Sequence, residues 1–152
     1  MAPFKFRLAS VLQLREHMKD QKQWELRVLY NSRREMLGKI DALEKQLLDS
    51  AGDIPGGQIF TALDLRLRAE HEQSLTKRLQ ASRATLAQLD DTIAEKRVEL
   101  VDAMRAVKSL EQLRSRHEER HWRAQNLAQQ RFSDEVAQRQ HVQPQTRKKI
   151  PS

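Results

Sequence analysis

Two histidines one helical turn apart are the first residues of this sequence that could carry chemistry. The run His117-Glu118-Glu119-Arg120-His121 matches the His-Glu-x-x-His pattern of zinc-dependent proteases. In that pattern both histidines share a helix face and bind zinc, and the glutamate activates water. Zinc hydrolysis also needs a third ligand and a cleft that excludes bulk water. The two residues before the second histidine are charged, which favours a solvated face, so we interpret the match as chance.

The rest of the chain offers no recognisable catalytic arrangement. We find no glycine-rich phosphate loop, no Ser/His/Asp set with a fold to hold it and no cleft with paired carboxylates. The chain also has no cysteine, which rules out disulfides and thiolate metal sites. We therefore expect a non-enzymatic protein that needs no metal or cofactor.

The two tryptophans, Trp24 and Trp122, are candidates for contact with another protein. Both fall outside the apolar heptad positions described below, on the outer faces of their helices. Large aromatic side chains often anchor protein interfaces. The alternative is that each packs along the stems of neighbouring Lys and Arg side chains.

Basic residues are concentrated at the two ends of the chain. Residues 105–152 carry 11 Lys/Arg against five Asp/Glu, and residues 1–30 carry six against three. A nucleic-acid partner is one interpretation, but the basic residues alternate with glutamates, as on a solvated helix face. The basic region also follows the strongest heptads and lacks a dense basic block. We therefore expect protein partners and no nucleic acid.

Composition favours long helices over a globular core. Charged residues make up 32% of the chain and aromatic residues 5%, which is too little apolar bulk for a compact domain of this size. The longest apolar run is three residues, at 28–30, so we expect neither a signal peptide nor direct membrane insertion. These features predict a cytosolic protein.

Heptad spacing places an apolar seam on two segments. The first seam has alternating steps of three and four residues and comprises Leu26, Leu29, Arg33, Met36, Ile40, Leu43 and Leu47. The second seam continues for more than four heptads and comprises Leu79, Ser82, Leu86, Leu89, Ile93, Lys96, Leu100, Ala103, Val107 and Leu110. Upstream of the first seam, Leu8, Val11, Arg15 and Met18 suggest a stripe out of phase with it, joined by a four-residue stutter around Lys22.

A cluster of helix breakers at residues 52–57, with three glycines and Pro55, separates the two seams. We predict an all-α fold in which two long helices form an antiparallel coiled-coil hairpin. Helix 1 would span about residues 5–50, the turn about 51–58 and helix 2 about 60–141. Helix 2 would overhang its partner beyond about residue 110. Residues 1–141 would form a single domain, followed by a disordered basic tail at residues 142–152.

Both ends of the chain resemble the FliJ family, a soluble component of the bacterial flagellar type III export apparatus. Residues 4–16 resemble the Phe-x-Phe-x-Leu-x-x-Val-Leu-x-x-Arg opening of that family. Residues 104–114 resemble its late-helix pattern of basic residues around paired leucines, and residues 131–139 its Asp-Glu-x-Ala ending. The length and the hinge position also agree, so the resemblance covers the whole chain.

The resemblance implies a hairpin similar to the central stalk of rotary ATPases. It implies three partners: a hexameric export ATPase, a membrane export-gate protein and export chaperones. The implied location is the cytoplasm, with peripheral association to the inner membrane through the export apparatus. The ATPase-end residues that it indicates are Phe4, Phe6, Arg7, Trp24, Trp122, Asp134, Glu135 and Arg139. The gate-end residues are Leu43, Leu47, His71 and Leu75, although the family leads us to expect aromatic residues there.

Two alternatives share this architecture. A stalk protein of a virulence type III secretion system has the same parts, and the Phe-x-Phe opening favours the flagellar system. A generic coiled-coil scaffold or tether would use its ends only as docking sites. Whichever of these functions applies, we expect this protein to be a strongly helical, elongated monomer or weak self-associator.

Overall fold

The computed structural model of the chain contains two long helices, α1 (Ala9–Gly52) and α2 (Ala62–Thr146). The structure describes residues 2–52 and 59–146, with side chains to residue 142. No strand occurs within these ranges. Contacts divide the chain into two units. The hairpin unit is Glu16–Met104, and the terminal unit combines Met1–Arg15 with Arg105–Ser152.

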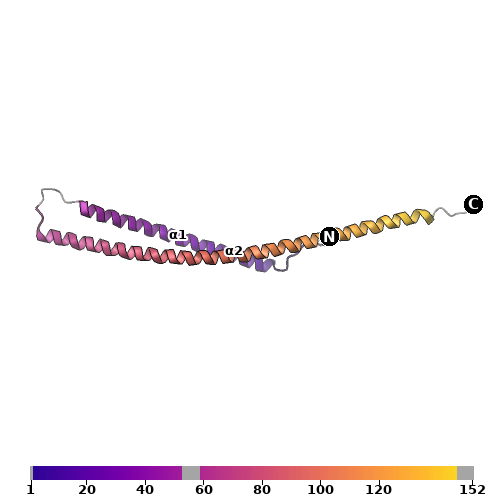
Figure 1. Cartoon of the computed structure of the whole chain (residues 1–152), viewed down its shortest axis with the longest axis horizontal. Coiled ribbons are helices and arrows are strands. Elements are labelled where there is room, and N and C mark those ends of the chain that lie inside the picture. The colour runs from indigo at the N-terminus through magenta and orange to yellow at the C-terminus, as the bar shows by residue number, and fades with distance from the viewer. Residues whose placement is uncertain (1, 53–58, 147–152) are drawn as a thin grey trace, which may run out of the picture. The chain divides into compact units, whose positions relative to one another are not determined.

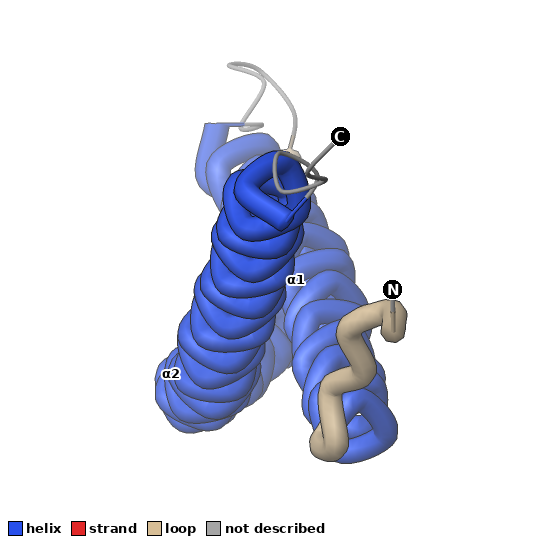
Figure 2. The backbone as a smooth tube through the Cα atoms, turned by 90° about the vertical axis from the view of Figure 1, so that its right-hand side faces the viewer, coloured by secondary structure: helices blue, strands red, loops and turns tan. Residues whose placement is uncertain are grey.

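The element boundaries are close to those predicted. Helix α1 begins at Ala9, later than the predicted residue 5, because residues 2–6 are not helical and a turn precedes the helix, in which Ala9 N donates to Phe6 O (3.2 Å). This N-terminal segment is the tan loop in Figure 2. Helix α2 continues to Thr146, past the predicted residue 141. Residues 53–58 of the predicted turn and 147–152 of the predicted tail lie outside the described residues.

A capping box starts α2. The Thr61 hydroxyl accepts a hydrogen bond from Asp64 N (3.2 Å), and the Asp64 carboxylate accepts from Thr61 N (3.0 Å) and from the Thr61 hydroxyl (2.7 Å). These bonds satisfy backbone donors that have no partner inside the helix. They also lower the pKa of Asp64, chiefly through the bond from the Thr61 hydroxyl. The helix therefore begins where the glycine-rich segment ends.

In the hairpin unit the two helices lie side by side and antiparallel (Figure 1). The predicted seam residues of this unit are all buried or half-buried, which confirms the heptad positions. Leu75 is the most buried, at 2% exposure. The fully buried seam is formed by Leu26, Ile40, Leu75, Leu79 and Ile93. Burying such aliphatic side chains contributes roughly 1.5–3 kcal/mol each.

Polar pairs flank this seam and fix its register. On one side, Arg83 pairs with Glu44 (2.9 Å), and Arg97 donates to the Tyr30 hydroxyl (2.6 Å) with its guanidinium 5.5 Å from the ring centre. Arg33, a seam position, bonds Asp90 (2.6 Å). As the α1 partner advances from Tyr30 through Arg33 to Glu44, the α2 partner moves back from Arg97 through Asp90 to Arg83. This order is expected of antiparallel helices.

The predicted stutter in helix 1 is wrong. Leu8, Val11 and Met18 are 37–40% exposed, and Arg15 is exposed, whereas Leu12 is only 5% exposed. Leu12 lies two heptads before Leu26, so α1 keeps one register throughout. The sequence conceals this register because positions 15, 16 and 19 are polar. The neighbouring apolar residues at positions 8, 11 and 12 do not by themselves show which of them faces the seam.

In the terminal unit, Leu12 and Val107 are buried, at 5% and 4% exposure. Further along α2 the apolar burial fades, and every residue from 126 to 142 is exposed. Arg114, His117, Ala124 and Ala128, which continue the predicted heptads, are also exposed. No helix in the described part of the chain is both long and apolar enough to cross a bilayer.

Candidate interaction sites

An extended N-terminal segment, Ala2–Phe6, lies against α2 in the terminal unit; we call it the strap. Phe4 packs against the ring of His121 (centroids 5.7 Å apart), and Phe6 packs edge-on against His117 (6.0 Å). The backbone carbonyl of Ala2 accepts from Gln125 Nε2 (2.9 Å) and lies 3.2 Å from His121 Nε2. Two rings and one carbonyl thus dock on the face of α2 between residues 117 and 125.

The spacing of the two aromatic pairs follows from backbone geometry. Residues i and i+2 of an extended chain are about 6.6 Å apart, and residues i and i+4 of a helix are about 6 Å apart along its axis. Phe4 and Phe6 therefore match His121 and His117 ring for ring, running in the opposite direction. The Phe-x-Phe opening and the two-histidine pattern are the two halves of one contact.

The strap is held by interactions of about the same size as the cost of ordering it. The two ring contacts and the two carbonyl contacts contribute about 0.5–1.5 kcal/mol each, and half-burial of two phenylalanines adds roughly 1 kcal/mol each. Ordering five backbone residues costs about 1–2 kcal/mol each, somewhat less where proline fixes φ. The docked and undocked forms are therefore close in free energy.

The contacts of His117 and His121 give the candidate zinc residues a packing role. Both rings contact phenylalanines of the strap, and His121 also contacts Trp122 edge-on (5.7 Å). Within residues 2–52 and 59–142, no three His, Asp or Glu side chains gather as metal ligands would. We therefore still interpret the match of residues 117–121 to the protease pattern, in which Glu118 is the glutamate, as chance.

The two tryptophans occupy different units. Trp122 is 47% exposed on α2 of the terminal unit, beside the strap contact. The residues around it on the same helix include Glu119 and Arg123, which form an ion pair (3.4 Å). Trp24 is 64% exposed on α1 of the hairpin unit. Both rings are available to another molecule.

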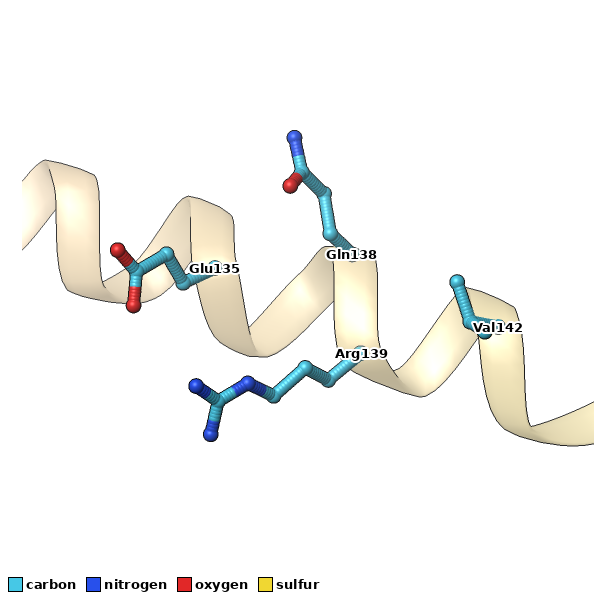
Figure 3. Close-up of a pocket in the computed structure, with 4 residues that line it drawn as sticks. All are labelled: Glu135, Gln138, Arg139 and Val142. Carbon is cyan, nitrogen blue, oxygen red and sulfur yellow. The ribbon is translucent and has the colours of Figure 1, made fainter.

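The remaining ATPase-end candidates do not gather with the strap. Arg7 is exposed in the turn before α1. Asp134, Glu135 and Arg139 are exposed on α2, in the stretch where every side chain is exposed. Figure 3 shows Glu135 and Arg139 with Gln138 and Val142 on successive turns of this one helix. All four of these residues belong to α2, so they form an open surface and no enclosed site.

The gate-end candidates lie in the hairpin unit with unequal exposure. His71 is exposed, Leu43 and Leu47 are half-buried, and Leu75 is the most buried side chain described. Leu75 therefore stabilises the hairpin. The other three members, Leu43, Leu47 and His71, keep some exposed surface.

A shallow notch between the two helices includes Leu43. It has a volume of about 470 Å³ and is lined by Lys39, Ala42, Leu43, Arg78, Ala81 and Ser82. The small side chains on both helices leave the apolar surface of Leu43 partly open. Lys39 and Arg78 stand at this notch without an ion pair to any described side chain. The notch is thus an apolar surface flanked by two unpaired cations.

Four charged side chains form a network beside the seam in the hairpin unit. Glu99 contacts Lys22 (2.8 Å) and Lys96 (3.1 Å), and Glu25 contacts Lys96 (3.3 Å) and Lys22 (3.6 Å). Hydrogen bonds from Lys22 and then Lys96 lower the pKa of Glu99. Bonds to Glu99 and then Glu25 raise the pKa of Lys96. The lowered pKa of Glu99 and the raised pKa of Lys96 both favour the charged forms of these two groups at neutral pH.

Sequence reasoning missed the strap and the notch. The strap could have been found from the paired spacings of Phe4–Phe6 and His117–His121, which are complementary. The notch left a weaker signal, because Ala42 and Ala81 are small at positions that face each other only once the register of the hairpin is known. Lys39 and Arg78 then appear as like charges across the helix pair.

Comparison with known proteins identifies the family. A search of curated proteins and a search of solved structures each returned no match. A family model described as "Flagellar FliJ protein" matches residues 4–146, nearly the whole chain. That range includes the strap residues Phe4 and Phe6, their partners His117 and His121, and both tryptophans. This chain belongs to the FliJ family and is thus a component of the flagellar protein-export apparatus.

Proposed function

We propose that this chain is a non-enzymatic stalk and chaperone-escort protein, which couples the export ATPase ring to the membrane export gate. Family membership supports the flagellar assignment over a virulence system or a generic tether. The observation that carries the proposal is the run of exposed side chains on α2, from 126 to 142, which no described part of the chain covers. We infer that this long exposed segment of helix functions as a binding surface for another protein.

The ATPase contact is assigned to the terminal unit. Trp122, the strap phenylalanines and the charged residues Asp134, Glu135 and Arg139 offer an aromatic anchor followed by a polar surface. Buried aromatic anchors with a polar rim are typical of protein interfaces. In this proposal, residues 126–142 are the overhanging end of helix 2 that enters the ATPase ring. Trp24 would supply a second contact from the hairpin unit.

The ATPase contact is tested by binding of the purified hexameric ATPase to single variants. Trp122→Ala should weaken binding roughly 30-fold or more, as expected of a residue whose truncation costs about 2 kcal/mol, and Trp122→Phe should restore part of it. Leu48→Ala, at an exposed position of the hairpin unit outside the assigned contact, is the control. Equal binding by all three variants would contradict the assignment of Trp122.

The gate contact is assigned to the notch in the hairpin unit and to the exposed His71. Two unpaired cations beside an apolar surface suit a gate segment with an aliphatic side chain next to carboxylates. Reversing both charges, Lys39→Glu with Arg78→Glu, should abolish gate binding. Lys77→Glu with Lys45→Glu reverses as much charge on nearby exposed positions and should have little effect. Loss of binding in both double variants would point to net charge instead of the notch.

Export chaperones are the third proposed class of partner. By binding this chain, they would bring the export substrates that they carry close to the gate. In this view the chain works in the cytoplasm and associates with the inner membrane only through the apparatus. The coiled coil serves as a spacer, so no catalytic group is required.

A further inference from the structure

Two residues assigned to the ATPase contact are turned onto the protein's own surface. Phe4 and Phe6 are half-buried against His121 and His117. His121 and Gln125, which hold the Ala2 carbonyl, are half-buried as well. While the strap is docked, a partner can reach only part of each of these side chains.

We propose that the strap is a displaceable cover, which occupies the 117–125 face of α2 in the free protein and is released when the export ATPase binds. This inference rests on the proposed function, because it names the regulation of the ATPase contact. Release would free two phenylalanine rings and, beside Trp122, the covered parts of His121 and Gln125. The already exposed His117 would lose its contact with Phe6. The docked strap is then an autoinhibitory contact.

The contacts of the strap suit a part that must leave. They amount to two ring contacts and one carbonyl with two side-chain neighbours, and the described strap side chains form no ion pair. The docked and undocked forms have similar free energies, so modest differential affinity shifts the population. A partner that binds only the undocked form has its apparent affinity reduced by the fraction of molecules that are docked.

The neighbouring tryptophan connects the cover to the assigned contact. His121 touches Phe4 on one side and Trp122 on the other, at the same centroid separation of 5.7 Å. Phe4 and Trp122 therefore share one ring between them. Removing Phe4 changes the surroundings of His121 and leaves Trp122 at the edge of a continuous open face.

The absence of cysteine from the chain allows a direct test. Ala2→Cys combined with Gln125→Cys places thiols on the two residues that are brought together by the 2.9 Å contact from Gln125 Nε2 to the Ala2 carbonyl. A short bis-methanethiosulfonate cross-linker would then lock the strap, and a reductant would release it. We expect the cross-linked fraction to bind the purified export ATPase roughly tenfold more weakly than the same protein after reduction. Circular dichroism of both forms checks that helicity is unchanged.

A matched lock in the hairpin unit controls for the chemistry. Ser50→Cys with Glu72→Cys joins another pair in contact (3.1 Å) and should leave ATPase binding the same before and after reduction. Equal binding by the locked and released strap would overturn the inference and leave the proposed ATPase contact standing. If neither the released variant nor the wild-type protein binds the ATPase, the proposed function fails and this inference fails with it.

Discussion

Glu99 is the residue at which the charge contacts of the hairpin unit converge. Its carboxylate lies within 3.1 Å of two lysine ammonium groups, one on each helix. Exposed ion pairs contribute little individually, and networks contribute more. The residue is therefore placed to make hairpin stability depend on pH, because each of its contacts requires the ionised form.

Acidification should destabilise the hairpin through Glu99. Its pKa is lower in the folded protein than its ordinary 4.5, so its contribution is present above that value and is lost as the pH falls through the lower folded value. Thermal melts of wild type and Glu99→Gln from pH 7 downward should therefore differ most near neutrality and converge in acid. Glu70→Gln, which removes an exposed intrahelical pair, should follow the wild-type curve.

The pKa of Lys96 is raised, so its contribution to stability depends on pH in the opposite direction to that of Glu99. Its contribution is present below the ordinary value of 10.5 and is lost as the pH rises through the higher folded value. The charge network therefore stabilises the hairpin over a broad window between the two. A wild-type melting temperature that did not fall at either limit would show that the network has no role in stability.

At the residue scale, His117 and His121 matched a zinc-protease pattern that we interpreted as chance, and the fold gives both rings a packing role. Spacing on a helix is readable from the chain, since residues four apart share a face. Which group packs against that face is determined by the tertiary structure, and the spacing along the helix does not reveal it. Only the matching spacing of Phe4 and Phe6 linked the two ends, and nothing local showed that the first residues would be extended.

At the scale of the element, the start of α2 depends on a few side-chain bonds at Thr61. Replacing Thr61 with Ala removes the hydroxyl of the capping box and should cost about 1 kcal/mol of unfolding free energy. Urea titration followed by circular dichroism measures this cost.

Thr76→Ala is the matched control for the cap. The hydroxyl of Thr76 bonds back to the Glu72 carbonyl inside the helix (2.8 Å), an interaction that does not satisfy a helix end. Alanine is also the better helix former, so this variant should be neutral or slightly stabilised. Equal losses in the two variants would contradict a capping role for Thr61.

Helix α2 was predictable where the spacing of apolar residues was unbroken, as from Leu79 to Leu110. The early part of α1 was not, because Lys19 and Lys22 sit on the inner face, where the pattern calls for apolar residues. Lys22 is stabilised there by Glu99 on the other helix, and such a partner is invisible to a reading of one helix. The start of α1 was predicted too early for the same reason. Residues 2–6 pack against α2 as the strap instead of forming a helix, and the sequence of one helix does not show that partner.

At the scale of the whole molecule, stability is concentrated in few side chains. Leu75→Ala removes the most buried of them and should cost about 2–5 kcal/mol, with a large loss of helicity in circular dichroism. Leu48→Ala, at a position that is 71% exposed, should change the unfolding free energy by less than about 0.5 kcal/mol. Similar costs for both would mean that the seam does not hold the helices together.

The charge network of Lys22, Glu25, Lys96 and Glu99 also has a consequence for how the chain reaches its native pairing. A seam of leucines tolerates sliding by one heptad, since each leucine would meet another apolar side chain. A hairpin displaced by seven residues would break the two contacts between the helices, Lys22–Glu99 and Glu25–Lys96, and keep only the one contact within each helix, Lys22–Glu25 and Lys96–Glu99. The network therefore favours the native alignment over a hairpin displaced by one heptad, because only the native alignment makes both contacts between the helices.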